Sequence, residues 1–127
     1  MKKMTNAERN ERVATEIREW MLDNEIWIDT RIYFNGKAYG TRDENHNFYY
    51  NDRNHLVVLE NMNPLDYFEY VNPETISMSF EGPLYDVLNY CGGGYADKLE
   101  REFSEILAKY GLYYELGNAW NLTCGEL

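Results

Sequence analysis

The chain has 127 residues, of which 44% are hydrophobic and 27% are charged, and its formal net charge is −10. This length suits one domain that can bury a core without disulfides or metal, and the composition excludes a disordered acidic tail. The negative charge argues against direct binding to nucleic acid or to an acidic membrane.

Positive charge is concentrated in the first part of the sequence. Residues 1–53 hold nine Lys or Arg and ten Asp or Glu, whereas residues 54–127 hold three and twelve. No Lys or Arg occurs between Arg53 and Lys98. We therefore expect the second half to present an anionic surface with few cations near enough to neutralise it.

The first half predicts a helix followed by an antiparallel meander. Thr5 and Glu8 match a capping box that opens a helix over residues 5–24, and apolar residues recur along one face of that helix. The Asn35-Gly36 pair predicts a tight hairpin, because both central positions of such a turn favour positive φ. The expected strands of this half are residues 26–28, 32–34, 37–40, 48–50 and 56–59.

The second half predicts two longer helices, a short helix, a strand and a final hairpin. Residues 75–80 alternate polar and apolar side chains, which places Ile76, Met78 and Phe80 on the buried face of a strand. The other expected elements are a short helix over 64–70, helices near 83–90 and 95–110, and a hairpin of strands 112–114 and 119–122 around Gly117-Asn118.

Together these elements predict a single α+β domain over residues 1–127. Its antiparallel sheet, with the Asn35-Gly36 hairpin and a C-terminal hairpin, is expected to pack on the helices near 5–24, 83–90 and 95–110. The reason is that each apolar helix stripe must be buried against something. No apolar run approaches the roughly 20 residues of a membrane span, and the chain opens on a charged rather than an apolar segment, which predicts a cytoplasmic protein.

Neither the glycine run nor the histidines predict a cofactor or metal site. Gly92-Gly93-Gly94 precedes a helix but lacks the spacing of a phosphate-binding loop, so a hinge or a tight connection is the expected use. His46 and His55 have no partners at metal-ligand spacing and are expected at the surface. We therefore expect no cofactor and no metal.

No motif in the chain indicates a catalytic nucleophile. Ser77 and Ser79 alternate with core positions and are expected to face solvent or a neighbouring helix. Cys91 falls on the apolar face of its helix, and Cys124 lies near a chain end that is expected to fray. The sequence therefore predicts no catalytic residue and no enzyme; an enzyme acting on a cationic substrate ranks behind two binding functions.

Two short segments, 66–70 and 84–86, interleave acids with aromatic rings that short helices cannot all bury. One interpretation is that Phe68 and one tyrosine cap the core while the acids are solvated. The other is a partner-binding surface, in which carboxylates meet Arg or Lys and rings supply packing and cation–π contact. The candidate partner-binding residues are Glu60, Asp66, Tyr67, Glu69, Tyr70, Glu74, Glu81, Tyr85 and Asp86.

Two binding functions follow from this surface. In the first, the chain is an inhibitor that occupies the basic nucleic-acid-binding surface of a DNA- or RNA-handling protein, as a DNA-mimic anti-restriction or anti-CRISPR protein of a phage or mobile element. Duplex DNA carries about twenty charges over a domain diameter near ~36 Å, and twelve carboxylates permit partial mimicry. In the second, the chain is an adaptor or regulatory subunit with a Tyr-rich anionic face. Neither function involves direct binding to nucleic acid or to a membrane.

Overall fold

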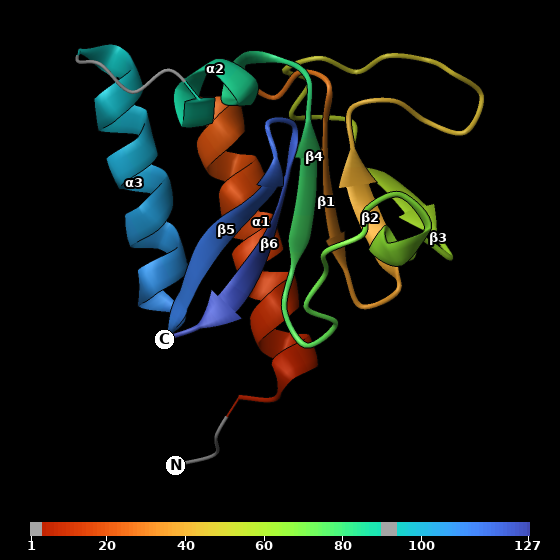
Figure 1. Ribbon diagram of the computed structural model, residues 1–127. Helices are drawn as coiled ribbons and strands as arrows, with labels where there is room; N and C mark the ends of the chain where they lie inside the picture. Colours follow the sequence, from red (N-terminus) through yellow and green to blue (C-terminus); the bar gives the residue numbers. More distant parts are fainter. Residues whose placement is uncertain (1–3, 90–93) are drawn as a thin grey trace.

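A six-stranded antiparallel sheet carries helices on one face in the computed structural model, which describes residues 4–89 and 94–127 (Figure 1). The strand order is β3-β2-β1-β4-β6-β5. This confirms the predicted α+β class. The elements are α1 (Asn6–Asp23), β1 (Thr30–Phe34), β2 (Lys37–Gly40), β3 (Val57–Glu60), a 3₁₀ turn η1 (Pro64–Asp66), β4 (Ser77–Phe80), α2 (Pro83–Asn89), α3 (Tyr95–Lys109), β5 (Leu112–Asn118) and β6 (Asn121–Glu126).

Helix α1 begins where the capping pattern predicts. The Thr5 hydroxyl accepts the backbone N–H of Glu8 at 3.1 Å, and the same hydroxyl donates to the Glu8 carboxylate at 3.0 Å. The apolar stripe of the helix, Val13, Ile17 and Met21, is fully buried against the sheet. Local capping and periodic burial therefore specify this element together.

Both predicted hairpins are present. Asn35 and Gly36 take φ values of 52° and 78° in the turn between β1 and β2, as the two-residue loop requires. The C-terminal hairpin turns two residues later than predicted, because β5 continues through Asn118 and β6 begins at Asn121. There the Asn118 side chain accepts the backbone N–H of Trp120 at 2.9 Å and stabilises the later turn.

Two apolar runs that predict strands are not strands. Residues 26–28 lie between two positive-φ residues, Glu25 and Asp29, and the backbone N–H of Trp27 bonds to the Asn51 side chain instead of to a strand. Residues 48–50 keep only one isolated bridge, from Phe48 to Arg42. In residues 26–28 a side-chain hydrogen bond thus replaces the expected ladder, whereas residues 48–50 keep one backbone hydrogen bond, from Tyr49 to Thr41.

The predicted helix over 64–70 is also wrong beyond its first turn. Asn63 caps Leu65 as the Asn-Pro signal implies, but regular structure ends with the 3₁₀ turn at Asp66. Phe68 then turns inward and is buried on the sheet. Packing of Phe68 on the sheet therefore overrides the helix start that Asn63-Pro64 predicts.

The core lies between the sheet and the helices. Phe103 and Leu107 of α3, Met78 and Phe80 of β4, and Cys124 of β6 are all buried in one cluster. The expected fraying at Cys124 is wrong, because β6 lies between β4 and β5 and is hydrogen-bonded on both sides. In the described part of the chain, no helix combines the length and apolarity needed to cross a membrane.

Candidate binding surface

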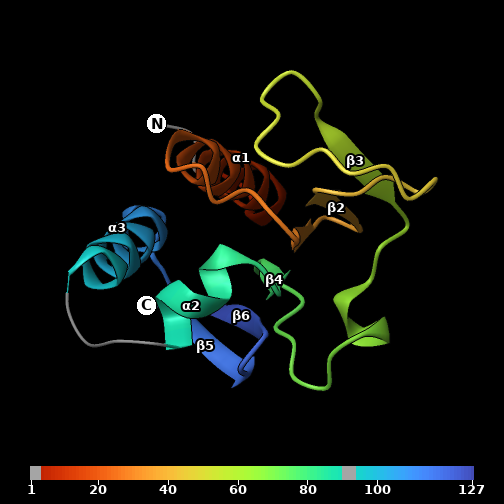
Figure 2. The same ribbon diagram turned by 90° about the horizontal axis from the view of Figure 1, so that it is seen from above.

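The face of the sheet opposite the helices, here called the open face, carries mostly small or polar side chains. Its central row places Arg31 of β1 opposite Gly40 of β2 and Ser79 of β4. The next row places Tyr33 between Ala38 and Ser77 by the same register. Arg31 and Tyr33 are therefore two large side chains flanked by small residues on the neighbouring strands. Figure 2 shows that α1 and α3 lie on one side of the sheet while the segment containing η1 lies on the other.

Residues 61–75, here called the covering segment, pack over part of the open face. The Phe68 ring meets Tyr33 edge-on, with centroids 5.4 Å apart, and lies 5.7 Å from the Trp120 ring. Farther along, the backbone N–H of Asn72 donates to the Thr123 hydroxyl at 2.9 Å. The segment is thus attached to the sheet at both an aromatic and a polar contact.

Ser77 is not a surface nucleophile. It is 1% exposed and its hydroxyl lies 2.9 Å from that of Thr123 on the open face. The expectation that Ser77 faces solvent or a helix is therefore wrong, because the covering segment fills the space above it. Ser79 does face away from the helices, toward an open cavity.

A second attachment joins the covering segment to the edge strand β5. The hydroxyls of Tyr70 and Tyr113 donate to the two carboxylate oxygens of Glu115, at 3.1 and 3.0 Å. The hydrogen bond to Glu115 raises the pKa of both tyrosines, because their phenolate forms would face a carboxylate. Both hydroxyls therefore act as donors across the physiological pH range.

An open cavity of about 280 Å³ lies beside the covering segment on the open face. Arg31, Tyr33 and Ser79 belong to the sheet beneath it, and Tyr67, Phe68, Phe48 and Trp120 bring aromatic rings to its lining. Asp29, Glu81 and Arg42 line it as well. The cavity is therefore walled by rings and mixed in charge.

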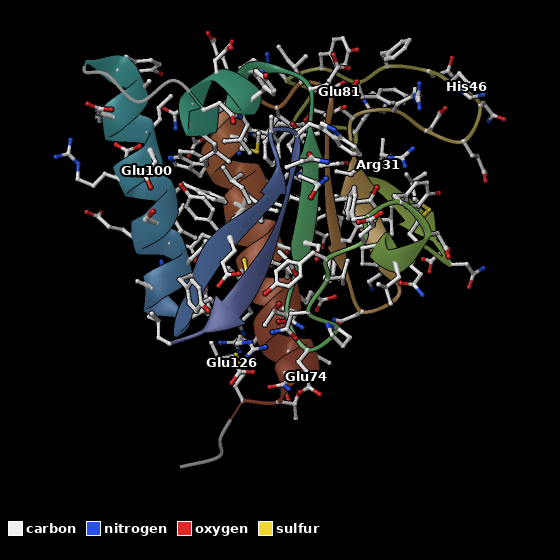
Figure 3. All side chains as sticks on the ribbon, in the orientation of Figure 1. Arg31, His46, Glu74, Glu81, Glu100 and Glu126 are labelled. Atoms are coloured by element: carbon white, nitrogen blue, oxygen red, sulfur yellow. The ribbon has the colours of Figure 1, made fainter. Side chains whose placement is uncertain are left out.

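Arg31 occupies an unusual position for a cation in a protein of charge −10. Its side chain meets the ring of Tyr67, with the guanidinium carbon 5.8 Å from the centroid, and donates to the Tyr33 hydroxyl at 3.4 Å. Within residues 4–89 and 94–127, no carboxylate oxygen lies within 4.0 Å of its nitrogens. In Figure 3, Arg31 lies on the open face below Glu81.

The structure brings together five of the nine residues that the sequence nominated. Asp66, Tyr67, Glu69 and Tyr70 are exposed on the covering segment, and Glu81 lines the adjoining cavity. These residues share one side of the sheet.

The other four nominated residues lie elsewhere. Glu60 is on the edge strand β3. Glu74 is near the end of the covering segment, away from the cavity and at the foot of α1, where Asn6 donates to its carboxylate at 3.0 Å (Figure 3). Tyr85 and Asp86 belong to α2, and Tyr85 packs against the core. The run 60–86 is therefore continuous in sequence but not in space.

The open-face residues Arg31, Tyr33, Glu115 and Trp120 are absent from the nominated set. A signal for two of them was available, because alternation in β1 puts Arg31 and Tyr33 on the face opposite Ile32. Glu115 reaches the site through the pairing of β5 with β6, and Trp120 through the turn between these two strands. Spacing in the sequence does not disclose that contact.

The carboxylates of residues 60–86 differ from several of those in α1 in their partners. Glu11, Glu16 and Glu19 of α1 form ion pairs with Lys37, Lys109 and Arg53. In the described part of the chain, the acids of residues 60–86 form no ion pair with Lys or Arg. Those acids are Glu60, Asp66, Glu69, Glu74, Glu81 and Asp86.

The histidines and the glycine run add no recognisable chemistry. His55 stacks on Tyr49 at 4.7 Å and bonds to Asp52, whereas His46 is exposed. Across the described residues, no group of three His, Cys, Asp or Glu side chains could hold a metal ion. Gly94 caps α3 with a φ of 70°, and the predictions for Cys91, Gly92 and Gly93 lie outside the described residues.

The Cys124 thiol is expected to be unreactive in the folded protein. Burial raises its pKa to about 12, so almost no thiolate exists at pH 8. In a Cys91→Ser variant, a chromogenic disulfide reagent should label Cys124 quickly in denaturant and very slowly without it. Rapid labelling of the native variant at pH 8 would contradict the buried position of β6.

Comparison of the chain with protein-family models, curated proteins and solved structures finds no match in any of the three.

Proposed function

We propose that this protein is a non-enzymatic binding protein that docks on a basic surface of a partner protein. Its docking surface, here called the acid–aromatic surface, consists of Asp66, Tyr67, Glu69 and Tyr70 on the covering segment, with Glu81 beside them. The observation that carries this proposal is that these carboxylates are exposed and form no ion pair with a described cation, whereas Glu11, Glu16 and Glu19 of α1 do.

Exposed carboxylates without an ion pair keep more of their field toward an approaching partner than paired carboxylates do. A basic groove would be drawn to them by long-range attraction, which increases the association rate more than the final affinity. The exposed rings of Tyr67 and Tyr70 would then cover apolar or guanidinium groups of the partner. The hydrogen bond from Tyr70 to Glu115 holds its ring in place and lowers the entropy lost on binding.

The specific partner we favour is a DNA- or RNA-handling protein whose nucleic-acid groove the chain would occupy as an inhibitor. Such a groove is lined by Lys and Arg to neutralise phosphates, so it is complementary to a surface of unpaired carboxylates. Inhibition of a restriction or CRISPR enzyme by a phage or mobile-element protein would be one biological form of this. The function would not require the chain itself to bind nucleic acid.

The exposed apolar area also supports a second candidate, an adaptor or regulatory subunit. Leu65, Tyr67 and Tyr70 are each more than half exposed on the covering segment. Aromatic and aliphatic side chains of this kind are more typical of an ordinary protein interface than of a surface that imitates phosphates. In this function the partner would have a basic or mixed surface without a nucleic-acid groove.

Reversing two charges of the acid–aromatic surface should weaken the complex. The Asp66→Lys, Glu69→Lys variant is expected to associate with its partner protein at least tenfold more slowly than wild type at low salt. Wild-type association should also slow as salt rises, because the Debye length falls from about 10 Å at 0.1 M to about 3 Å at 1 M. Surface-based kinetics with purified partner would measure both effects.

A matched control separates this surface from the net charge. Glu25 and Glu105 are exposed, lie away from the covering segment and form no ion pair in the described part of the chain. The Glu25→Lys, Glu105→Lys variant changes net charge equally and should associate nearly as fast as wild type. Equal slowing by both pairs would overturn the assignment of the surface. Competition by a short DNA duplex would favour the inhibitor, and its failure would favour the adaptor.

A further inference from the structure

We infer that the open-face cavity is a binding site for a small aromatic carboxylate, with Arg31 as the group that holds the carboxylate. This inference does not rest on the proposed docking function, although Tyr67 and Glu81 line the cavity and also belong to the acid–aromatic surface. Its ligand is a small molecule and its central residue is a cation. The cavity volume of about 280 Å³ is at the lower end of small-molecule sites. That volume suits one ring with one short substituent.

The first support is the state of Arg31. It is half-buried, and the protein supplies it with a ring face and one long hydrogen bond, but with no carboxylate within 4.0 Å among the described residues. A guanidinium has five N–H donors in a planar arrangement that matches a carboxylate. In a chain with 22 acids, a partly desolvated arginine without an ion pair is suited to an anion from outside.

The second support is the floor around Arg31. In register, Gly40 and Ser79 flank it on the neighbouring strands. Gly40 lies beneath the side chains of Leu59 and of Arg31 itself, whereas Ser79 lines the cavity. The Ser79 hydroxyl can therefore donate to the second oxygen of a carboxylate that Arg31 holds.

The third support is the aromatic lining. Tyr67 and Phe68 come from the covering segment, Phe48 from the loop after β2, and Trp120 from the C-terminal hairpin. Rings from three segments that are distant in sequence thus meet at one cavity. They favour an apolar planar group over a bare inorganic anion, since stacked or edge contacts add to burial of its surface.

The acids of the cavity restrict the charge of the ligand. Asp29 and Glu81 are adjacent across the strands, where the Glu81 N–H donates to the Asp29 carbonyl at 3.0 Å. Arg42 also lines the cavity, but Asp29 and Glu81 offset part of the positive charge. Because these two acids line the same cavity, a dianion such as an aryl phosphate would meet stronger repulsion there than a monoanion.

Binding of benzoate, followed by backbone amide NMR shifts, tests this inference. Benzoate should shift the amides of Arg31, Ser79 and Tyr67 in a saturable way, and phenyl phosphate should bind more weakly. The Arg31→Met variant should weaken benzoate binding by about tenfold or more, as loss of a charged hydrogen bond implies. Arg31→Lys keeps the charge without the planar donors and should give an intermediate affinity.

Two controls make the outcome decisive. Arg53→Met removes a cation that is paired with Glu19 and Asp23 outside the cavity, so it should leave benzoate affinity unchanged. Benzylamine keeps the ring but carries the opposite charge and should bind more weakly than benzoate. The inference is overturned if benzoate causes no saturable shift, if benzylamine binds as tightly, or if Arg31→Met weakens binding no more than Arg53→Met does.

Discussion

Replacing Phe103 by alanine is expected to lower the free energy of unfolding by about 3–5 kcal/mol, as for other aromatic core truncations. Phe103 is fully buried in α3, and its ring stacks 5.7 Å from Trp20 of α1 and lies 5.4 Å from Tyr114 of β5. The ring therefore joins two helices and a strand, and its loss leaves a cavity that none of them can fill alone. Urea unfolding followed by circular dichroism would measure the change.

The control for this prediction lies at the start of the same helix. Tyr95 is 59% exposed, so Tyr95→Ala should cost less than about 1 kcal/mol. If the two variants unfolded at the same urea concentration, the buried stripe of α3 would be assigned to the wrong face.

Replacing Gly82 by alanine is expected to destabilise the protein by about 1–3 kcal/mol, the range of an overpacked site. A Cβ atom at this position would lie 2.2 Å from the carbonyl oxygen of Ile28 and 3.0 Å from its carbon. Both contacts are with backbone, so no flexible side chain can move aside. To relieve the clash, the backbone before β1 and the backbone after β4 would have to move apart. Thermal unfolding would record a lower midpoint.

Gly40 provides the matched comparison. It also lies in the sheet region, but a Cβ there would have its nearest neighbours at 3.6 Å, an ordinary contact distance. Gly40→Ala should therefore leave stability unchanged or raise it slightly, because the unfolded chain loses freedom. A Gly82→Ala variant as stable as Gly40→Ala would show that the backbone at Gly82 does not approach the backbone at Ile28 so closely.

The elements that could be predicted from sequence are those whose causes are local. Thr5 and Glu8 cap α1 within one turn, and Asn35-Gly36 determines its own hairpin by backbone preference. Residues 26–28 could not be assigned this way, because Asn51, far along the chain, takes the hydrogen bonds of Trp27. The apolar side chains of residues 26–28 correctly indicate that this run is buried. They do not show whether its backbone belongs to a strand, and it does not.

The same distinction applies to the candidate surface. The acids and tyrosines of residues 66–70 were recognisable because they are adjacent in sequence and too many to bury. The role of Arg31 was not recognisable, because Arg31 lies in the first half of the sequence, far from the anionic half. The sheet reverses that separation by pairing β1 with β4, which places Arg31 beside Ser79.

The strand order also bears on how the protein folds. The hairpins β1–β2 and β5–β6 join neighbours in sequence, and such hairpins form in microseconds. β4 pairs with β1 on one side and β6 on the other, and both pairings close long stretches of chain. Since non-local pairing slows folding, we expect the capture of β4 between the two preformed hairpins to limit the folding rate. A protein made of two quickly formed halves would thus acquire its native structure only when four residues, Ser77–Phe80, join them.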